Sequence, residues 1–167
     1  MTIFQVTGLK DLFKIILMQN FKAYILEKKN KLTYKENLKK PILSKFQVLV
    51  KIEYTSVCGS QLFEISGKRG LDKYLPHLLG HEAVGVVLEK HKSVKKVKKG
   101  DQVILSWIKS KGGESGGFKI NDEEGKVYNA GSITTFSNIS VISENRIIKK
   151  PKNMNLKSAC LFGCCIP

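Results

Sequence analysis

Residues 76–85 read Pro76-His77-Leu78-Leu79-Gly80-His81-Glu82-Ala83-Val84-Gly85, and they run from a turn into an apolar strand predicted over residues 82–89. The glycine before the strand lets the backbone bend, and the histidine beside it is a borderline metal ligand. A second motif of this kind, Val57-Cys58-Gly59-Ser60-Gln61, follows another predicted strand over residues 48–54. These two strand ends are therefore the first candidate site.

The rest of the pattern is mainly β. The predicted strands cover residues 22–27, 48–54, 82–89, 102–107, 139–142 and 146–149, with Gly85 at a bulge. Residues 109–131 are rich in glycine, serine and charge, which predicts a long loop. Asn155 is predicted to cap a short helix over residues 156–162 that Gly163 ends. Short strands at irregular spacing indicate a small barrel-like β fold with a little helix.

The charge balance is strongly basic. The 167 residues carry 29 Lys+Arg against 14 Asp+Glu, a formal net charge of +15, and this length fits one domain. Such a balance is typical of nucleic-acid binders, but the dense lysine run over residues 90–99 holds no arginine and no aromatic residue. Base recognition and stacking use those residue types. Nucleic-acid binding is therefore disfavoured, and the run is predicted to be a solvated loop and the start of the next strand.

No membrane partner is expected, because no apolar run approaches the roughly 18 residues that span a bilayer. Residues 1–17 are expected to form an N-terminal extension. Apolar residues recur there at helical spacing, which indicates a short amphipathic helix; a membrane-surface helix is the alternative. These apolar residues are Leu9, Leu12, Phe13, Ile16 and Leu17.

The four cysteines are Cys58, Cys160, Cys164 and Cys165. Their spacing is not that of a secreted disulfide framework, so a reduced, cytoplasmic setting is expected. Two thiolates and one imidazole, from Cys58, His81 and Cys164, would suit Zn²⁺ and leave a fourth position open. A buried core cysteine with a hydrogen-bonded histidine is the alternative. Cys160 and Cys165 are predicted to be packed thiols, and His77 and His91 to be surface or loop histidines.

The sequence resembles the N-terminal, GroES-like catalytic domain of the zinc-dependent medium-chain alcohol dehydrogenase superfamily. The matching stretches are residues 48–52, 57–60, 76–85, 99–104 and 161–164, in the family's order. The resemblance covers residues 18–167. It implies one domain there with a mainly β, GroES-like, partly open β-barrel and a few short helices.

The resemblance also implies roles for single residues. Cys58, His81 and Cys164 fall on the family's catalytic zinc ligands. The match therefore favours Cys164 over its neighbour Cys165 as the third ligand. Glu82 falls on an acid that can approach the metal, and Ser60 on the hydroxyl that passes the substrate proton toward solvent. Trp107 falls where the family places a substrate-pocket residue. The local alternatives are a turn-capping role for Ser60 and a core role for Trp107.

Three departures from the family pattern matter. Gln61 stands where many members have an aspartate that orients the zinc-bound histidine, so we hypothesise an altered metal affinity or a subfamily trait. Residues 109–131 contain no cysteine, so we expect one catalytic zinc at most and no structural zinc. No Gly-x-Gly-x-x-Gly turn follows a strand, so no cofactor-binding residue is predicted and NAD(P) is implied for the complete enzyme only.

The resemblance therefore implies the N-terminal zinc-binding catalytic domain of an NAD(P)-dependent alcohol or polyol dehydrogenase-like oxidoreductase, inactive alone. A small-molecule alcohol, polyol or sugar would be the substrate of the complete enzyme. A separate Rossmann-domain chain or a homo-oligomer would be the protein partner. The alternatives are a stand-alone zinc-binding GroES-like module without catalysis and, less favoured, a basic nucleic-acid-binding domain.

Overall fold

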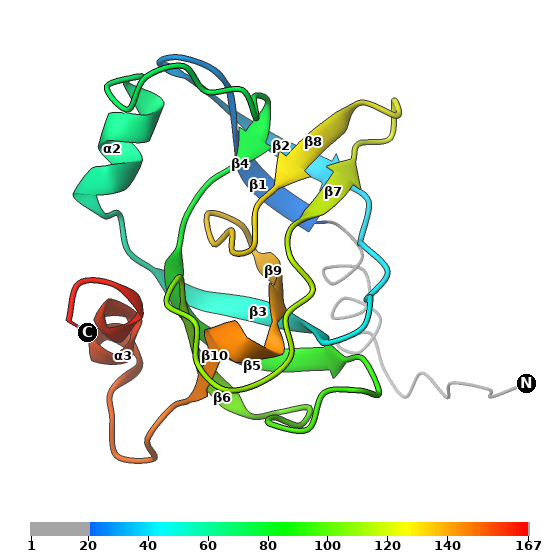
Figure 1. Ribbon diagram of the computed structural model, residues 1–167, viewed down its shortest axis with the longest axis vertical. Coiled ribbons are helices and arrows are strands. Elements are labelled where there is room, and N and C mark those ends of the chain that lie inside the picture. The colour runs from blue at the N-terminus through cyan, green and yellow to red at the C-terminus, as the bar shows by residue number, and fades with distance from the viewer. Residues whose placement is uncertain (1–20, 167) are drawn as a thin grey trace, which may run out of the picture.

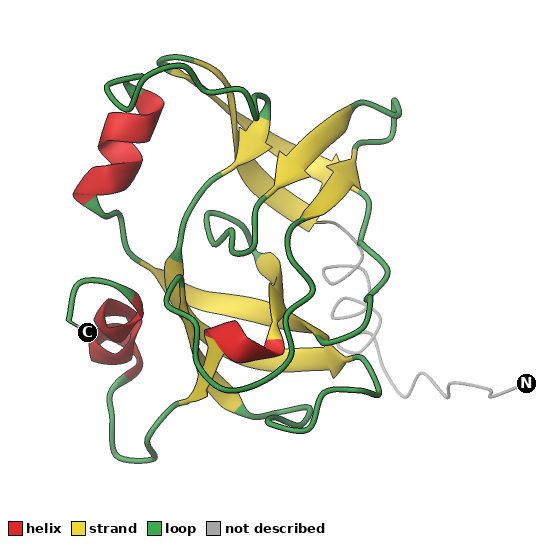
Figure 2. Cartoon of the chain, in the orientation of Figure 1, coloured by secondary structure: helices red, strands yellow, loops and turns green. Residues whose placement is uncertain are grey.

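The computed structural model describes residues 21–166, and the extension predicted over residues 1–17 lies outside the described residues. Strands dominate this part of the chain (Figure 2). They form two five-stranded sheets, which lie one above the other in the view of Figure 1.

The first sheet has the strand order β2-β1-β4-β8-β7. Its members are β1 (Phe21–Lys28), β2 (Lys31–Leu38), β4 (His77–Leu78), β7 (Phe118–Asn121) and β8 (Val127–Ala130). The second sheet has the order β10-β6-β5-β3-β9. Its members are β3 (Gln47–Thr55), β5 (Glu82–Lys90), β6 (Gln102–Ser106), β9 (Ile139–Ser143) and β10 (Ile147–Lys149).

Buried side chains of β3 point alternately to its two faces and pack into two separate core clusters. Leu49 packs with buried residues of the first sheet, such as Phe21 and Tyr128. Val48 and Val50 point the other way, into a second cluster within the second sheet. Because successive side chains on a strand face opposite sides, this one strand belongs to both clusters and joins the two sheets.

Four short helical segments complete the described chain: α2 (Gly59–Ile65), α3 (Leu156–Cys160), and the 3-10 turns η1 (Glu144–Arg146) and η2 (Leu161–Gly163). The Asn155 side chain accepts a hydrogen bond from the backbone N–H of Lys157, so the predicted cap is confirmed. α3 packs through Ala159 and Cys160 against Val84 of β5. This contact places the end of the described chain beside the start of β5.

Most predicted strands are confirmed to within a residue or two, and a register shift in β3 lies opposite Gly85. The loop predicted over residues 109–131 is wrong in part, because β7 and β8 form a hairpin within it. Its strands have four residues each, too few for their alternation to stand out from the flanking glycines. β2 and the two-residue β4 were also not predicted, and Arg146 lies in η1 rather than in a strand.

The lysine run over residues 90–99 follows the end of β5 as a loop, as predicted. The buried carboxylate of Glu144 accepts hydrogen bonds from the backbone N–H groups of Lys95 and Lys96, at 2.6 and 2.8 Å. The backbone of the run is thus tied to η1. Within residues 21–166, no helix is long and apolar enough to cross a membrane.

Candidate metal centre

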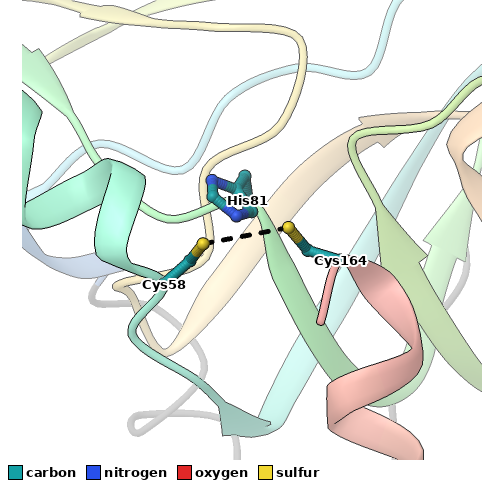
Figure 3. Close-up of side chains that lie close together, drawn as sticks. All are labelled: Cys58, His81 and Cys164. Atoms are coloured by element: carbon teal, nitrogen blue, oxygen red, sulfur yellow. Dashed lines mark hydrogen bonds between the residues drawn. The ribbon is translucent and has the colours of Figure 1, made fainter. Parts of the chain in front are cut away.

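Strand pairing brings two distant motifs together at one end of the second sheet. β3 and β5 are antiparallel, and Thr55 near the end of β3 pairs with Ala83 near the start of β5. Cys58 follows the end of β3 and His81 precedes β5. The pairing therefore sets these two residues at the same end of the sheet, and Figure 3 shows their side chains side by side.

The third residue, Cys164, lies near the C-terminal end of the described residues and directly follows η2. The Ser106 hydroxyl at the end of β6 donates a 2.7 Å hydrogen bond to the Gly163 carbonyl, which ties η2 to the sheet. A Cβ on Gly163 would overlap the Leu105 carbonyl oxygen and lie 2.6 Å from Glu82 Cβ. Only glycine permits this approach, so Gly163 sets the position of the cysteine that follows it.

One ligand atom each from Cys58, His81 and Cys164 lies within 4.8 Å of the other two. The two sulfur atoms are 3.9 Å apart, and the imidazole lies beside them (Figure 3). Nδ1 of His81 contacts the Gln61 amide, which leaves Nε2 as the ligand atom. Nε2 is buried and has no hydrogen-bond partner within residues 21–166.

A zinc ion fits this donor set. Buried polar atoms of folded proteins are almost always hydrogen-bonded, so an unpartnered imidazole nitrogen facing two sulfurs indicates a metal ligand. Two thiolates and one imidazole are a known catalytic zinc set. Burial also lowers the pKa of His81, which favours the neutral imidazole that ligates metals.

The two thiols differ in acidity because their neighbours differ. Hydrogen bonds from Ser60, first from its side chain, lower the pKa of the Cys58 thiol. Burial, and then the neighbouring Cys58, raise the pKa of the Cys164 thiol to about 11, while a hydrogen bond from the Trp107 side chain opposes that rise. Cys58 therefore loses its proton first. A bound cation would favour the thiolate form of both.

The other predicted site residues surround the thiols. Ser60 is half-buried in the first turn of α2, beside Cys58. Trp107 lies just past the end of β6, more than half exposed, so the core alternative is wrong for it. Glu82 is fully buried, and its two carboxylate oxygens accept hydrogen bonds from the backbone N–H and the thiol of Cys165, each at 3.3 Å.

Two smaller expectations need correction. Cys160 is buried as predicted, whereas Cys165 is exposed and bonded to Glu82 rather than packed. His77 is buried in β4 because its strand is covered on both sides by β1 and β8, so it is not a surface or loop histidine. Its Nε2 lies 2.8 Å from Asp72, and Nδ1 lies 2.8 Å from the Leu78 carbonyl.

Sequence reasoning missed Glu64. Its Oε2 accepts a 3.0 Å hydrogen bond from the buried Gln61 amide, and Gln61 in turn contacts His81. Glu64 follows Gln61 by three residues on α2, and residues at that spacing are neighbours on a helix. That spacing was the signal in the sequence. Gln61, Glu64 and His81 also line a cavity of about 720 Å³.

Comparison with known proteins identifies the family of this chain. The family model described as the alcohol dehydrogenase GroES-like domain matches residues 44–152. The chain belongs to this family. Its resemblance to the N-terminal catalytic domain is thereby confirmed, and the mainly β fold described above is the GroES-like fold.

Two relatives illustrate the similarity. An alcohol dehydrogenase of Geobacillus stearothermophilus is 41% identical over 92 residues, which is 55% of this chain and 27% of the relative. An S-(hydroxymethyl)glutathione dehydrogenase of Photobacterium damsela subsp. piscicida is 30% identical over 146 residues, 72% of this chain and 39% of the relative. This GroES-like chain thus spans well under half the length of either.

Solved structures show the same fold. An alcohol dehydrogenase zinc-binding domain protein from Burkholderia ambifaria matches with a TM-score of 0.73 at 20% identity. A benzyl alcohol dehydrogenase from Acinetobacter calcoaceticus matches with a TM-score of 0.67 at 24% identity. Each match covers 87% of this chain and 45% of the other.

Proposed function

We propose that this chain is the N-terminal zinc-binding catalytic domain of an NAD(P)-dependent alcohol or polyol dehydrogenase-like oxidoreductase. The observation that carries the proposal is the convergence of Cys58, His81 and Cys164, with a buried imidazole nitrogen that has no hydrogen-bond partner among the described residues. Family membership supports the same chemistry. The domain is proposed to span residues 18–167, behind an extension over residues 1–17.

Zinc, when bound, would polarise the oxygen of an alcohol or carbonyl substrate, and NAD(P) in the complete enzyme would exchange the hydride. The chain's own residues do the rest. The thiolates of Cys58 and Cys164 and Nε2 of His81 would hold the metal. The Ser60 hydroxyl, half-buried beside Cys58, passes a proton between the substrate oxygen and solvent. The exposed ring of Trp107 bounds the substrate space beside Cys164.

The substrate is proposed to be a small-molecule alcohol, polyol or sugar, in keeping with the alcohol dehydrogenases among the relatives. The cofactor-binding part of the complete enzyme is proposed to be a Rossmann domain, and the protein partner of this chain to be a separate Rossmann-domain chain or a second copy of itself. The described chain alone should therefore bind zinc without turning over NAD(P). NAD(P)-dependent turnover by the purified chain would contradict that part of the proposal.

Metal titration tests the site itself. The metal-free chain, titrated with Zn²⁺ or Co²⁺, should bind one equivalent, and Co²⁺ should give a thiolate charge-transfer band. Cys164→Ser should lose tight binding because it removes a ligand. Cys165→Ser is the matched control, one residue further along, and should bind like the unaltered chain. Equal losses in the two variants would contradict the assignment of Cys164.

A further inference from the structure

The Gln61 side chain is oriented by partners on both of its polar atoms. Its Oε1 accepts a 2.6 Å hydrogen bond from the backbone N–H of Gly80, and its Nε2 donates a 3.0 Å hydrogen bond to Glu64 Oε2. Turning the Gln61 amide over would place its oxygen against the Glu64 carboxylate and its NH₂ group against the Gly80 N–H. Both contacts would become repulsive, so the amide has one favoured orientation.

Glu64 is itself held in place. Its Oε2 lies 3.8 Å from Nη1 of Arg69, and its Oε1 lies 3.7 Å from Nε2 of His77. The His77 ring is fixed in turn by Asp72 and the Leu78 carbonyl. The carboxylate therefore stays against the Gln61 amide, on a short helix that also carries Gln61 itself.

The consequence falls on His81. The Gln61 atom that faces Nδ1 of His81, at 3.2 Å, is the amide nitrogen. An N–H donor there favours the tautomer in which Nδ1 is bare and Nε2 carries the proton. A metal on Nε2 requires the opposite tautomer, with the proton on Nδ1. That proton would then point at another donor unless the amide turned over.

We propose that Glu64, acting through Gln61, is a positioning residue that weakens metal binding by holding His81 in the tautomer with its proton on Nε2. The inference rests on the proposed metal site and deepens it. The aspartate usual in the family would accept a proton on Nδ1. Here the amide of Gln61 donates instead. The Glu64 carboxylate, one helical turn away, holds the amide in the orientation that points its NH₂ group at Nδ1.

The first experiment compares Zn²⁺ affinities of the full chain carrying Glu64→Gln or Glu123→Gln. Charge alone predicts weaker binding of a cation when the carboxylate near His81 is removed. The proposal predicts the opposite sign, because the Gln61 amide becomes freer to turn over. Glu64→Gln should bind Zn²⁺ about threefold more tightly than Glu123→Gln, whose exposed carboxylate lies in the β7–β8 turn. Equal or weaker binding overturns the proposal.

A charge-conserving exchange gives a sharper comparison. The double variant Gln61→Glu with Glu64→Gln keeps the net charge, and it places an acceptor beside Nδ1 of His81. Its Zn²⁺ dissociation constant should fall about tenfold, in the range by which partners of metal-bound histidines change affinity. A constant equal to or above that of the unaltered chain would contradict the proposal.

A third measurement observes the tautomer of His81 directly and leaves Gln61 and Glu64 unchanged. Nitrogen-15 spectra of the metal-free chain should show a bare Nδ1 and a protonated Nε2 for His81, assigned with a His81→Asn sample. A proton on Nδ1 instead would refute the proposal.

Cys58→Ser distinguishes failure of the metal-site proposal from failure of the tautomer proposal. If the unaltered chain and Cys58→Ser bind Zn²⁺ equally, the metal site is wrong; if only Glu64→Gln fails to tighten binding, the tautomer proposal alone is wrong.

Discussion

At the scale of single residues, the chemistry of the site depends on small polar neighbours of the ligand atoms. Ser60 stabilises the Cys58 thiolate through hydrogen bonds, and burial keeps the Cys164 thiol protonated to higher pH. Burial also favours neutral His81. The imidazole is therefore favoured in its neutral form, and the Cys58 thiol is more acidic than the Cys164 thiol, which loses its proton last as a metal binds.

Ser60→Ala should raise the pKa of Cys58, because the hydrogen bond from the hydroxyl to the sulfur is lost and the thiolate is less stabilised. Metal binding requires the thiolate, so the pH at which half of the chain holds Zn²⁺ should move upward. Ultraviolet thiolate absorbance and Zn²⁺ titrations at several pH values measure both effects. Ser66→Ala, at the other end of the same helix, is the control and should change neither.

At the scale of elements, the candidate site forms where three segments of the chain come together. These are the residues after β3, the residues before β5 and the end of η2. The antiparallel pairing of β3 with β5 sets Cys58 against His81, and the bond from Ser106 to Gly163 sets η2 against both. α2 contributes Gln61, whose amide contacts Nδ1 of the imidazole. The ligands thus lie on irregular segments that a rigid sheet positions.

Gly163→Ala should weaken Zn²⁺ binding about 10- to 100-fold, because its new Cβ would overlap the Leu105 carbonyl and displace Cys164. The far-UV circular dichroism spectrum should change little, since η2 lies at the edge of the sheet. Gly59→Ala is the matched control. A Cβ at Gly59 would meet nothing within 4 Å, although the residue adjoins Cys58. If both variants bind equally well, close packing at Gly163 does not position the ligand.

At the scale of the whole molecule, the two sheets share a core through β3. Leu49 faces the first sheet, whereas Val48 and Val50 face the cluster of the second. The described residues should unfold as one cooperative unit.

Leu49→Ala should lower the free energy of unfolding by about 2–5 kcal/mol, the usual cost of a cavity at a fully buried leucine. Denaturant unfolding followed by circular dichroism and by Trp107 fluorescence measures it, and the two signals should coincide. Leu71→Ala is the control, because that side chain is 98% exposed. Separate transitions for the two signals would show that the sheets unfold independently.

The candidate site residues could be proposed from the sequence because short motifs carry the family resemblance. Cys58-Gly59-Ser60 and Gly80-His81-Glu82 each lie at a predicted strand end, and their likeness to the family's motifs marked them as site candidates. The long apolar strands were recognisable for a similar reason, since alternation over eight or nine residues is a strong pattern. The hairpin of β7 and β8 was not, because four-residue strands carry little pattern and owe their order to packing of Tyr128 and Ile120 in the shared core.

The sequence by itself determined the mainly β class and the family, and it singled out Cys58, His81 and Cys164 as the candidate ligands. Only the tertiary structure decided that their ligand atoms come within 4.8 Å, that Cys165 bonds Glu82, and that Glu64 orients the Gln61 amide toward His81. The physical reason is that hydrogen-bond direction depends on which atoms face each other in space. Residue types along the chain specify the available donors and acceptors, and folding decides which of them meet.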